Sequence, residues 1–203
     1  MDSVANKKPR SRIIGVGAAL PKTIVTNEDL SQTIDTSDQW IVERTGIKER
    51  RIATTNELTS SLGVEASEIA IKNSGLKNSD IEMIVLATAT PDNTFPATAT
   101  AIQKGLGIKD GYAYDLQAVC SGFVFALESA DNAIRLEKVN NALVIGSETF
   151  SRILDWKDRS TCVLFGDGAG AVVLQSDSSN TNSGILSNHL HSDGEYGDML
   201  YVD

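Results

Sequence analysis

Cysteine, histidine and proline are scarce in this chain, and each scarcity narrows the class of protein. Among 203 residues there are two cysteines, two histidines and four prolines. The cysteines, Cys120 and Cys162, lie in different sequence contexts and form neither a disulfide framework nor a zinc-binding spacing. Such sparse cysteine usage favours a reducing compartment, so the cytoplasm is the expected location.

Positive charge and long apolar runs are also lacking. The net charge is -9 and the isoelectric point is near 4.7, which argues against nucleic acid or an anionic membrane as a partner. Every apolar run is far shorter than the roughly 18 to 20 residues needed to cross a bilayer. The opening residues, MDSVANKKPRSR, are polar and lack the apolar core of a secretory signal. We therefore expect residues 1–11 to form a disordered arm.

The remaining composition is that of an ordinary globular protein, with 41% hydrophobic and 22% charged residues. Runs of β-forming residues begin at Ile13, Met83, Tyr112, Ala142 and Cys162, and segments with helical periodicity lie between them. This alternation predicts an α/β fold in which helices cover both faces of a mixed sheet.

Capping residues mark the ends of the predicted helices. Thr26 precedes a short acidic helix, and either Thr36 or Ser37 can cap the next one, which Gly46 ends. A longer helical pattern runs from Glu57 to Ser74 before a second stop glycine.

The stretch from Tyr112 to Leu136 is a strand-like run that turns at Cys120 into an amphipathic helix. A cysteine at the start of a helix lies among unpaired backbone N–H groups at the positive end of the helix dipole. That environment favours the nucleophilic thiolate over the thiol. The alternative is that Cys120 is a small buried hydrophobe, which is a common role of free cysteine.

Trp40 and Arg44 are spaced to share one face of a helix. They are either a core aromatic with an ion-paired arginine, or an aromatic beside a cation that can stack on a base and hold a phosphate. The basic segment TGIKERR, residues 45–51, is either a solvated charge run or a weak anion site.

Two further patterns suggest a ligand site only weakly. Residues 162–175 predict two β-runs around a bend at glycines 166–170, whose GxGxG spacing does not match a phosphate loop. His189 and His191 alternate on a predicted strand, but two histidines without a third ligand make a weak metal site, and we expect no metal.

Six segments taken in order resemble the N-terminal half of β-ketoacyl-acyl carrier protein synthase III, a family of thiolase-like condensing enzymes. They are DTSDQWIVERTGIKERR, ATATPDNTFPATA, DLQAVCSGFVFAL, GSETFS, DRSTCVLFGDGAGA and HLHSDGEYG. The resemblance implies one layered α-β-α half with a mixed five-stranded sheet, the second, duplicated half being missing. It places this half at residues 12–176, and a linker with the truncated start of the second half at residues 177–203.

The resemblance also implies a reaction. Cys120 would take an acyl group, acetyl being the expected one, from acyl-CoA and condense it with malonyl-acyl carrier protein, with no cofactor and within a homodimer. Trp40 and Arg159 would sandwich the coenzyme A adenine, and Thr36 and Arg44 would lie in the same region. Phe165 would line the acyl pocket. Phe95 would border the partner subunit's pocket.

The family's catalytic histidine and asparagine belong to the second half, and neither His189 nor His191 lies in that motif. The 203 residues are therefore expected to be inactive alone. The alternatives are a related condensing or acyl-transfer enzyme with another starter or extender, and a non-catalytic dimerising half.

Overall fold

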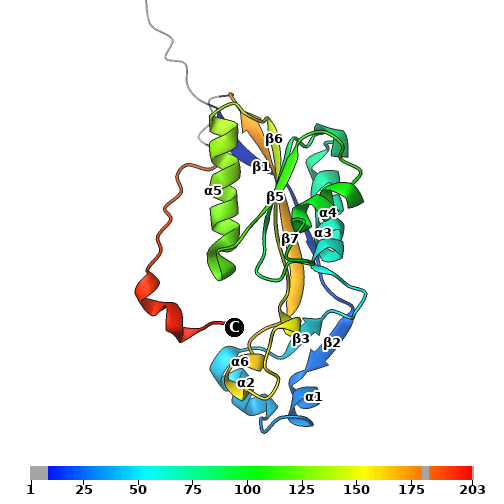
Figure 1. Ribbon diagram of the computed structural model, residues 1–203, viewed down its shortest axis with the longest axis vertical. Coiled ribbons are helices and arrows are strands. Elements are labelled where there is room, and N and C mark those ends of the chain that lie inside the picture. The colour runs from blue at the N-terminus through cyan, green and yellow to red at the C-terminus, as the bar shows by residue number, and fades with distance from the viewer. Residues whose placement is uncertain (1–8, 180–182, 203) are drawn as a thin grey trace, which may run out of the picture.

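A five-stranded mixed sheet forms the centre of the computed structural model, which describes residues 9–179 and 183–202 (Figure 1). The strand order is β1-β7-β6-β4-β5. Strand β4 pairs parallel with β5 and β6, while β7 pairs antiparallel with β6 and β1. The strands are β1 Arg10–Ala19, β4 Met83–Ala87, β5 Tyr112–Leu116, β6 Asn141–Thr149 and β7 Asp167–Asp177. The predicted mixed five-stranded sheet is confirmed.

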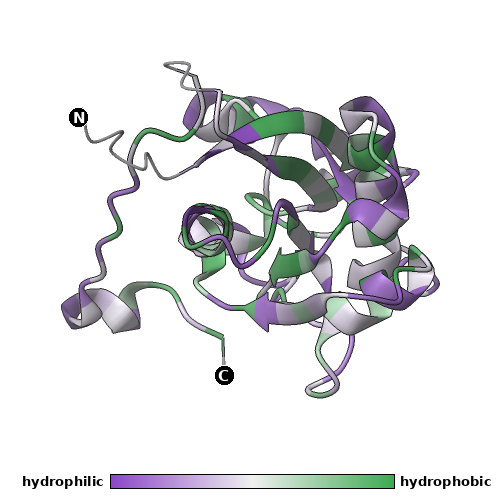
Figure 2. Cartoon of the chain, turned by 90° about the horizontal axis from the view of Figure 1, so that it is seen from above, coloured by the Kyte–Doolittle hydropathy of each residue, from purple (hydrophilic) through white to green (hydrophobic). Residues whose placement is uncertain are grey.

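Helices cover both faces of this sheet. They are α3 Thr59–Ser74 and α4 Thr98–Gly105 on one face, and α5 Gly122–Arg135 on the other (Figures 1 and 2). Leu62, Ile102 and Leu143 belong to the core beneath α3 and α4. Ile134 and Val144 belong to the core beneath α5. The strands thus bury apolar side chains on both faces, which the near-continuous apolar runs of β4 and β6 require.

Two glycines let α3 lie directly on β1. A Cβ atom on Gly15 would lie 2.1 Å from the carbonyl oxygen of Ala70, and one on Gly17 would lie 2.1 Å from that of Ala66. No real side chain tolerates such a distance, so the helix backbone approaches the strand only because these positions are glycine.

A smaller unit lies beside one end of the main sheet (Figure 1). It consists of an antiparallel pair of short strands with three short helices: β2 Thr23–Thr26, β3 Glu49–Ile52, α1 Asn27–Ser31, α2 Asp38–Thr45 and α6 Arg159–Cys162. Its core contains Leu30, Ile41, Cys162 and Val163. The two strands were missed in the sequence because each has four residues, and the second, ERRI, is mostly charged.

The predicted helix ends are largely confirmed. Thr26 accepts a hydrogen bond from Asp29 N at 3.1 Å, and the Asp29 carboxylate accepts one from Thr26 N at 2.8 Å, which completes a capping box. Ser37, rather than Thr36, caps α2 by accepting from Trp40 N at 3.1 Å. Gly46 ends α2 in the left-handed region at φ 74°.

Three boundaries differ from the prediction. Arg10 and Ser11 belong to β1, so the predicted arm is too long at this end, and its residues 1–8 lie outside the described residues. Cys162 ends α6 and begins no strand. Instead of a bend between two β-runs, glycines 168 and 170 lie within the single strand β7, because pairing with β1 and β6 on both sides holds the backbone extended.

The segment after β7 lies along the outer side of α5 and returns toward the smaller unit (Figures 1 and 2). Residues 183–193 form neither helix nor strand, so the predicted strand that carries His189 and His191 is wrong. The described part of the chain also contains short 3₁₀ helices, which are η1 Asn78–Asp80, η2 Val119–Ser121, η3 Phe150–Arg152 and η4 Gly194–Met199. Across the described ranges, no helix is both long and apolar enough to span a membrane.

Candidate active site around Cys120

Cys120 lies in turn η2, between the end of β5 and the start of α5. Its side chain is exposed, and the first turn of α5 has no side-chain cap from Ser121. The sulfur therefore lies near the N-terminal end of α5, which is the positive end of the helix dipole. The predicted position of Cys120 at the start of the helix is confirmed, and the alternative of a buried thiol is wrong.

The residue before the cysteine holds an unusual backbone conformation. Val119 has φ 46°, in the left-handed region that a β-branched side chain rarely adopts. Such a conformation costs on the order of 1–3 kcal/mol and persists only where the surrounding structure enforces it. It lets the chain turn sharply between β5 and α5, so that Cys120 lies just beyond the C-terminal end of β5.

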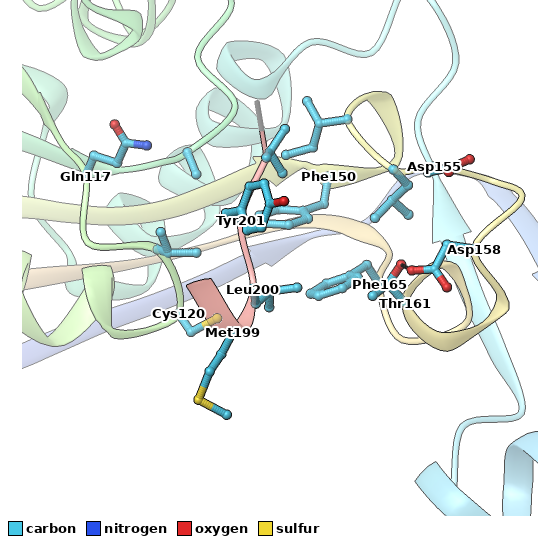
Figure 3. A pocket seen from close by; sticks show the side chains of 15 residues that line it. Gln117, Cys120, Phe150, Asp155, Asp158, Thr161, Phe165, Met199, Leu200 and Tyr201 are labelled. Atoms are coloured by element: carbon cyan, nitrogen blue, oxygen red, sulfur yellow. Dashed lines mark hydrogen bonds between the residues drawn. The ribbon is translucent and has the colours of Figure 1, made fainter. Parts of the chain in front are cut away.

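Cys120 opens onto a cavity of about 640 Å³ (Figure 3). That volume is within the usual range of roughly 300–1,000 Å³ for small-molecule sites. Apolar and aromatic residues from several elements form most of the lining, and two carboxylates, Asp155 and Asp158, lie at the end remote from the sulfur (Figure 3). Residues Met199, Leu200, Tyr201 and Val202 close one side of the cavity.

Phe165 lines this cavity, as expected for an acyl-pocket residue. It stacks on Phe150 with a centroid distance of 4.9 Å and an interplanar angle of 19°. Phe150, which sequence reasoning missed, thus fixes the orientation of Phe165 and adds a second aromatic wall. Phe95 is 82% exposed in the loop between β4 and α4 and is not among the lining residues of its own chain's cavity.

Two guanidinium groups contact the ring of Trp40. The guanidinium carbon of Arg44 is 4.3 Å from the centroid of the Trp40 ring, and that of Arg159 is 4.9 Å away. Arg159 Nη1 also donates to the backbone oxygen of Asp35 at 2.7 Å and lies 3.6 Å from its carboxylate. The structure therefore brings three of the predicted coenzyme A residues together by cation–π contact.

The gap between Trp40 and Arg159 is too narrow for a base in this conformation. A planar ring inserted between them requires two van der Waals layers of about 3.5 Å each. Arg159 must therefore move away from the ring before a base can enter. The hydroxyl oxygen of Thr36 is buried, with no hydrogen-bond partner among the described residues, so it too is not presented to a ligand here.

Helix α6 links this cluster to the cysteine cavity. Asp158, which caps α6, and Thr161 line the cavity, while Arg159 contacts Trp40. Hydrogen bonds from Ser160 and Thr161 hold the pKa of the Asp158 carboxyl below its usual range. The carboxylate is consequently charged at neutral pH.

Two carboxylates that sequence reasoning missed organise the loops beside the cavity. Glu148, at the end of β6, accepts from Ala89 N at 2.7 Å and Thr90 N at 3.1 Å, and also bonds the Thr90 hydroxyl. Asp167 accepts from Ala53 N at 2.6 Å and Ser151 N at 2.8 Å. Glu148 stands out in sequence because it follows the apolar run at residues 142–145 and is the only charged residue of β6, whereas nothing local marks Asp167.

The structure revises the interpretation of the basic segment 45–51 and of the two histidines. Arg50, within the basic segment 45–51, is only 6% exposed, whereas Lys48 is exposed, so this segment is not a uniformly solvated charge run. His189 and His191 are exposed and do not line the cavity, and His189 Nε2 lies 3.1 Å from Ser187 Oγ. No cluster of three potential ligands for a metal occurs within residues 9–179 and 183–202.

Comparisons with known proteins give a consistent match. Residues 114–194 match the family model of 3-oxoacyl-[acyl-carrier-protein] synthase III. The chain is 58% identical over 197 residues to a β-ketoacyl-[acyl-carrier-protein] synthase III of Paramagnetospirillum magneticum, covering 96% of this chain and 61% of the relative. A protein of the same description from Rhodospirillum centenum is 60% identical over 196 residues, with the same coverage.

The fold matches as well. A crystal structure of 3-oxoacyl-[acyl-carrier-protein] synthase III from Aquifex aeolicus superposes with a TM-score of 0.88 at 45% identity, covering 95% of this chain and 64% of that one. This confirms the expected thiolase-like α/β fold. The chain thus spans about 61% of the length of the curated relatives it matches. In sequence and fold it is therefore similar to an N-terminal portion of proteins described as β-ketoacyl-[acyl-carrier-protein] synthase III.

Proposed function

We propose that the protein containing this chain is a condensing acyltransferase that initiates fatty-acid synthesis. The observation that carries the proposal is the exposed Cys120 at the start of α5, facing a cavity of about 640 Å³ with an aromatic wall. The descriptions of its relatives as acyl-carrier-protein synthases support the same reaction.

In the first step, the Cys120 thiolate attacks the carbonyl carbon of a short acyl-CoA, with acetyl-CoA as the proposed donor. The carbon–sulfur bond to coenzyme A breaks, and coenzyme A leaves as its thiol after taking up a proton. The backbone N–H of Cys120 would contribute to stabilising the oxyanion, and Phe165 and Phe150 would exclude water from the acyl group.

In the second step, malonyl-acyl carrier protein loses CO₂, and the carbanion that remains attacks the acyl carbon on Cys120. A carbon–carbon bond forms, the bond to the cysteine sulfur breaks, and 3-ketoacyl-acyl carrier protein is released with a free thiolate. The described lining of the cavity contains two aspartates but no histidine. The groups that promote decarboxylation are therefore proposed to lie outside these 203 residues, which are not expected to complete the condensation alone.

The coenzyme A portion of the donor is proposed to bind at the Trp40 cluster. Arg44 and Arg159 place two positive charges beside an aromatic ring, a combination suited to an adenine with its phosphates. Because Arg159 closes the gap in this structure, adenine binding requires its side chain to rotate outward, with Thr36 lining the site once it is open.

A homodimer in the cytoplasm is part of the proposal. Phe95 is 82% exposed, and β5 is an edge strand of the sheet, so both are available to a second copy. Both cysteines are free, which accords with a reducing compartment.

The proposal is tested by incubating the protein, at its full natural length, with acetyl-CoA and mapping the modified peptide by mass spectrometry. We expect one acetyl group on Cys120 and none in Cys120→Ala. Addition of malonyl-acyl carrier protein should then discharge the acetyl group and yield the 3-ketoacyl product. Acetylation elsewhere, or none with any short acyl-CoA, would overturn the proposal.

A further inference from the structure

Arg50 is a buried cation whose partners are all neutral oxygens. Its side chain is on β3 and is 6% exposed. Nη1 donates to the carbonyl oxygen of Val25 at 3.2 Å, while Nη2 donates to Asn27 Oδ1 at 2.8 Å and to the carbonyl oxygen of Val163 at 3.2 Å. No carboxylate of the described residues forms an ion pair with it.

One branch of these contacts leads to α2. Asn27, which accepts from Arg50, donates through Nδ2 to Asp38 Oδ1 at 2.9 Å and to the carbonyl oxygen of Ile47 at 2.7 Å. Asp38 begins α2, and Ile47 lies just beyond its end. The side chain of Asn27 therefore bridges the two ends of the helix that carries Trp40.

The other branch leads to α6. Val163, whose carbonyl accepts directly from Arg50, is the C-cap of the helix that carries Arg159. A single guanidinium thus joins the helices on either side of the Trp40–Arg159 gap. A planar guanidinium suits this task, because its N–H groups point in fixed directions toward several acceptors at once.

We infer that Arg50 is a positioning residue that sets the separation of α2 and α6, and with it the binding of the adenine end of coenzyme A. The inference rests on the proposed function. Burying a charge among neutral acceptors is costly, and an apolar side chain of similar volume packs at lower cost. A guanidinium at this point is therefore better explained by the geometry it imposes than by the stability it adds.

The test compares two acyl donors in the protein at its full natural length. Acetyl-CoA carries the adenine end, whereas the acetyl thioester of N-acetylcysteamine presents the same thioester without it. Arg50→Lys keeps the positive charge but lacks the planar set of N–H donors of the guanidinium group. In this variant we expect KM for acetyl-CoA to rise about tenfold. We expect the rate of Cys120 acetylation by the short donor to change by less than about twofold.

A second variant interrupts the α2 branch without removing the buried charge. Asn27→Asp keeps the acceptor for Arg50, but it lacks the N–H donors to Asp38 and Ile47. It should show the same selective loss for acetyl-CoA. Arg51→Gln is the matched control, because the Arg51 side chain donates to the carbonyl oxygen of Pro21 at 3.1 Å and, within the described residues, forms no hydrogen bond with α2 or α6. Both donors should react with it as with the wild type.

Coenzyme A binding measured by calorimetry separates this inference from the proposed reaction. If the wild type binds coenzyme A but is not acetylated, the proposed function fails, and weaker binding to Arg50→Lys still supports the inference. The inference is overturned if Arg50→Lys impairs the reactions with acetyl-CoA and with the short donor by the same factor. It is also overturned if coenzyme A binds Arg50→Lys as tightly as the wild type. In either case Arg50 is only a structural contact. Absence of coenzyme A binding to the wild type overturns both.

Discussion

Cys120 and Cys162 place the same chemical group in two contrasting environments. Cys120 is exposed in turn η2 and lines the cavity, whereas Cys162 is fully buried at the end of α6, in the core of the smaller unit. Burial, and then the negative charge of Asp158, raises the pKa of the Cys162 thiol above its ordinary value, although Arg50 acts in the opposite direction. The contrast shows that access and surroundings, rather than residue type, decide which thiol can serve as a nucleophile.

The largest expected effect is on thiol reactivity. With iodoacetamide at neutral pH, Cys120 should alkylate at least about 100-fold faster than Cys162, because Cys162 reacts only after local unfolding. Peptide mapping over a time course measures both rates in one sample, and Cys120→Ala and Cys162→Ala check the assignment. Equal rates would remove the distinction between the two thiols.

The next effect is on stability. Cys162→Ser buries a hydroxyl among apolar neighbours and should lower the free energy of unfolding by about 1–3 kcal/mol. Cys120→Ser, at an exposed position, should change it by less than about 0.5 kcal/mol. Urea unfolding followed by circular dichroism gives both values. A larger loss of unfolding free energy in Cys120→Ser than in Cys162→Ser would contradict the assignment of Cys162 as the buried cysteine.

A smaller effect should appear at alkaline pH. Because the pKa of Cys162 is raised in the folded state, its stabilising contribution is complete below the unfolded value of 9.0 and declines as the pH rises above it. The decline attributable to this group is at most about 1.4 kcal/mol per pH unit. Urea unfolding under reducing conditions at pH 8 to 10 should show a shallower decline in Cys162→Ala than in wild type. Identical slopes would contradict the prediction.

The smallest effect concerns Arg159, on the helix that Cys162 ends. Asp35→Asn removes the carboxylate 3.6 Å from Arg159 but keeps the backbone oxygen that Arg159 also contacts. Arg159 should then leave the Trp40 ring more readily, and coenzyme A should bind about twofold more tightly. Calorimetric titration measures this change. Glu43→Gln is the control of equal charge, since Glu43 accepts from Gln39 on the same helix as Trp40.

Much of the fold followed from periodicity, because each main element is long enough to show its pattern. Strands β1, β4, β5 and β6 and the helices α3 and α5 were predicted, as were the Thr26 cap and the stop at Gly46, whereas β7 was predicted as two β-runs around a bend. The short strands β2 and β3 were missed, since four residues provide no clear period and Arg50 makes the second strand look exposed.

In the candidate site, too, local features could be predicted from the sequence and contacts between distant residues could not. The position of Cys120 and the proximity of Trp40 and Arg44 are properties of local sequence, because a turn into a helix and a spacing of four residues fix them. The contact of Arg159 with Trp40 joins residues far apart in the chain. The stacking of Phe150 on Phe165 joins η3 to the segment between α6 and β7. Neither pair can be derived from spacing.

By itself, the sequence determined most strands of the main sheet, the helices that cover it and several helix ends, and that one cysteine lies at the start of a helix. Only the tertiary structure decided that Cys120 faces a cavity while Cys162 is buried. It also decided that Arg50 is buried between two helices and that Arg159 closes the gap beside Trp40. The physical reason is the distance along the chain over which each interaction acts. Periodicity and capping act over a few residues, whereas desolvation, buried hydrogen bonds and cavity shape depend on groups that the fold brings together from distant positions.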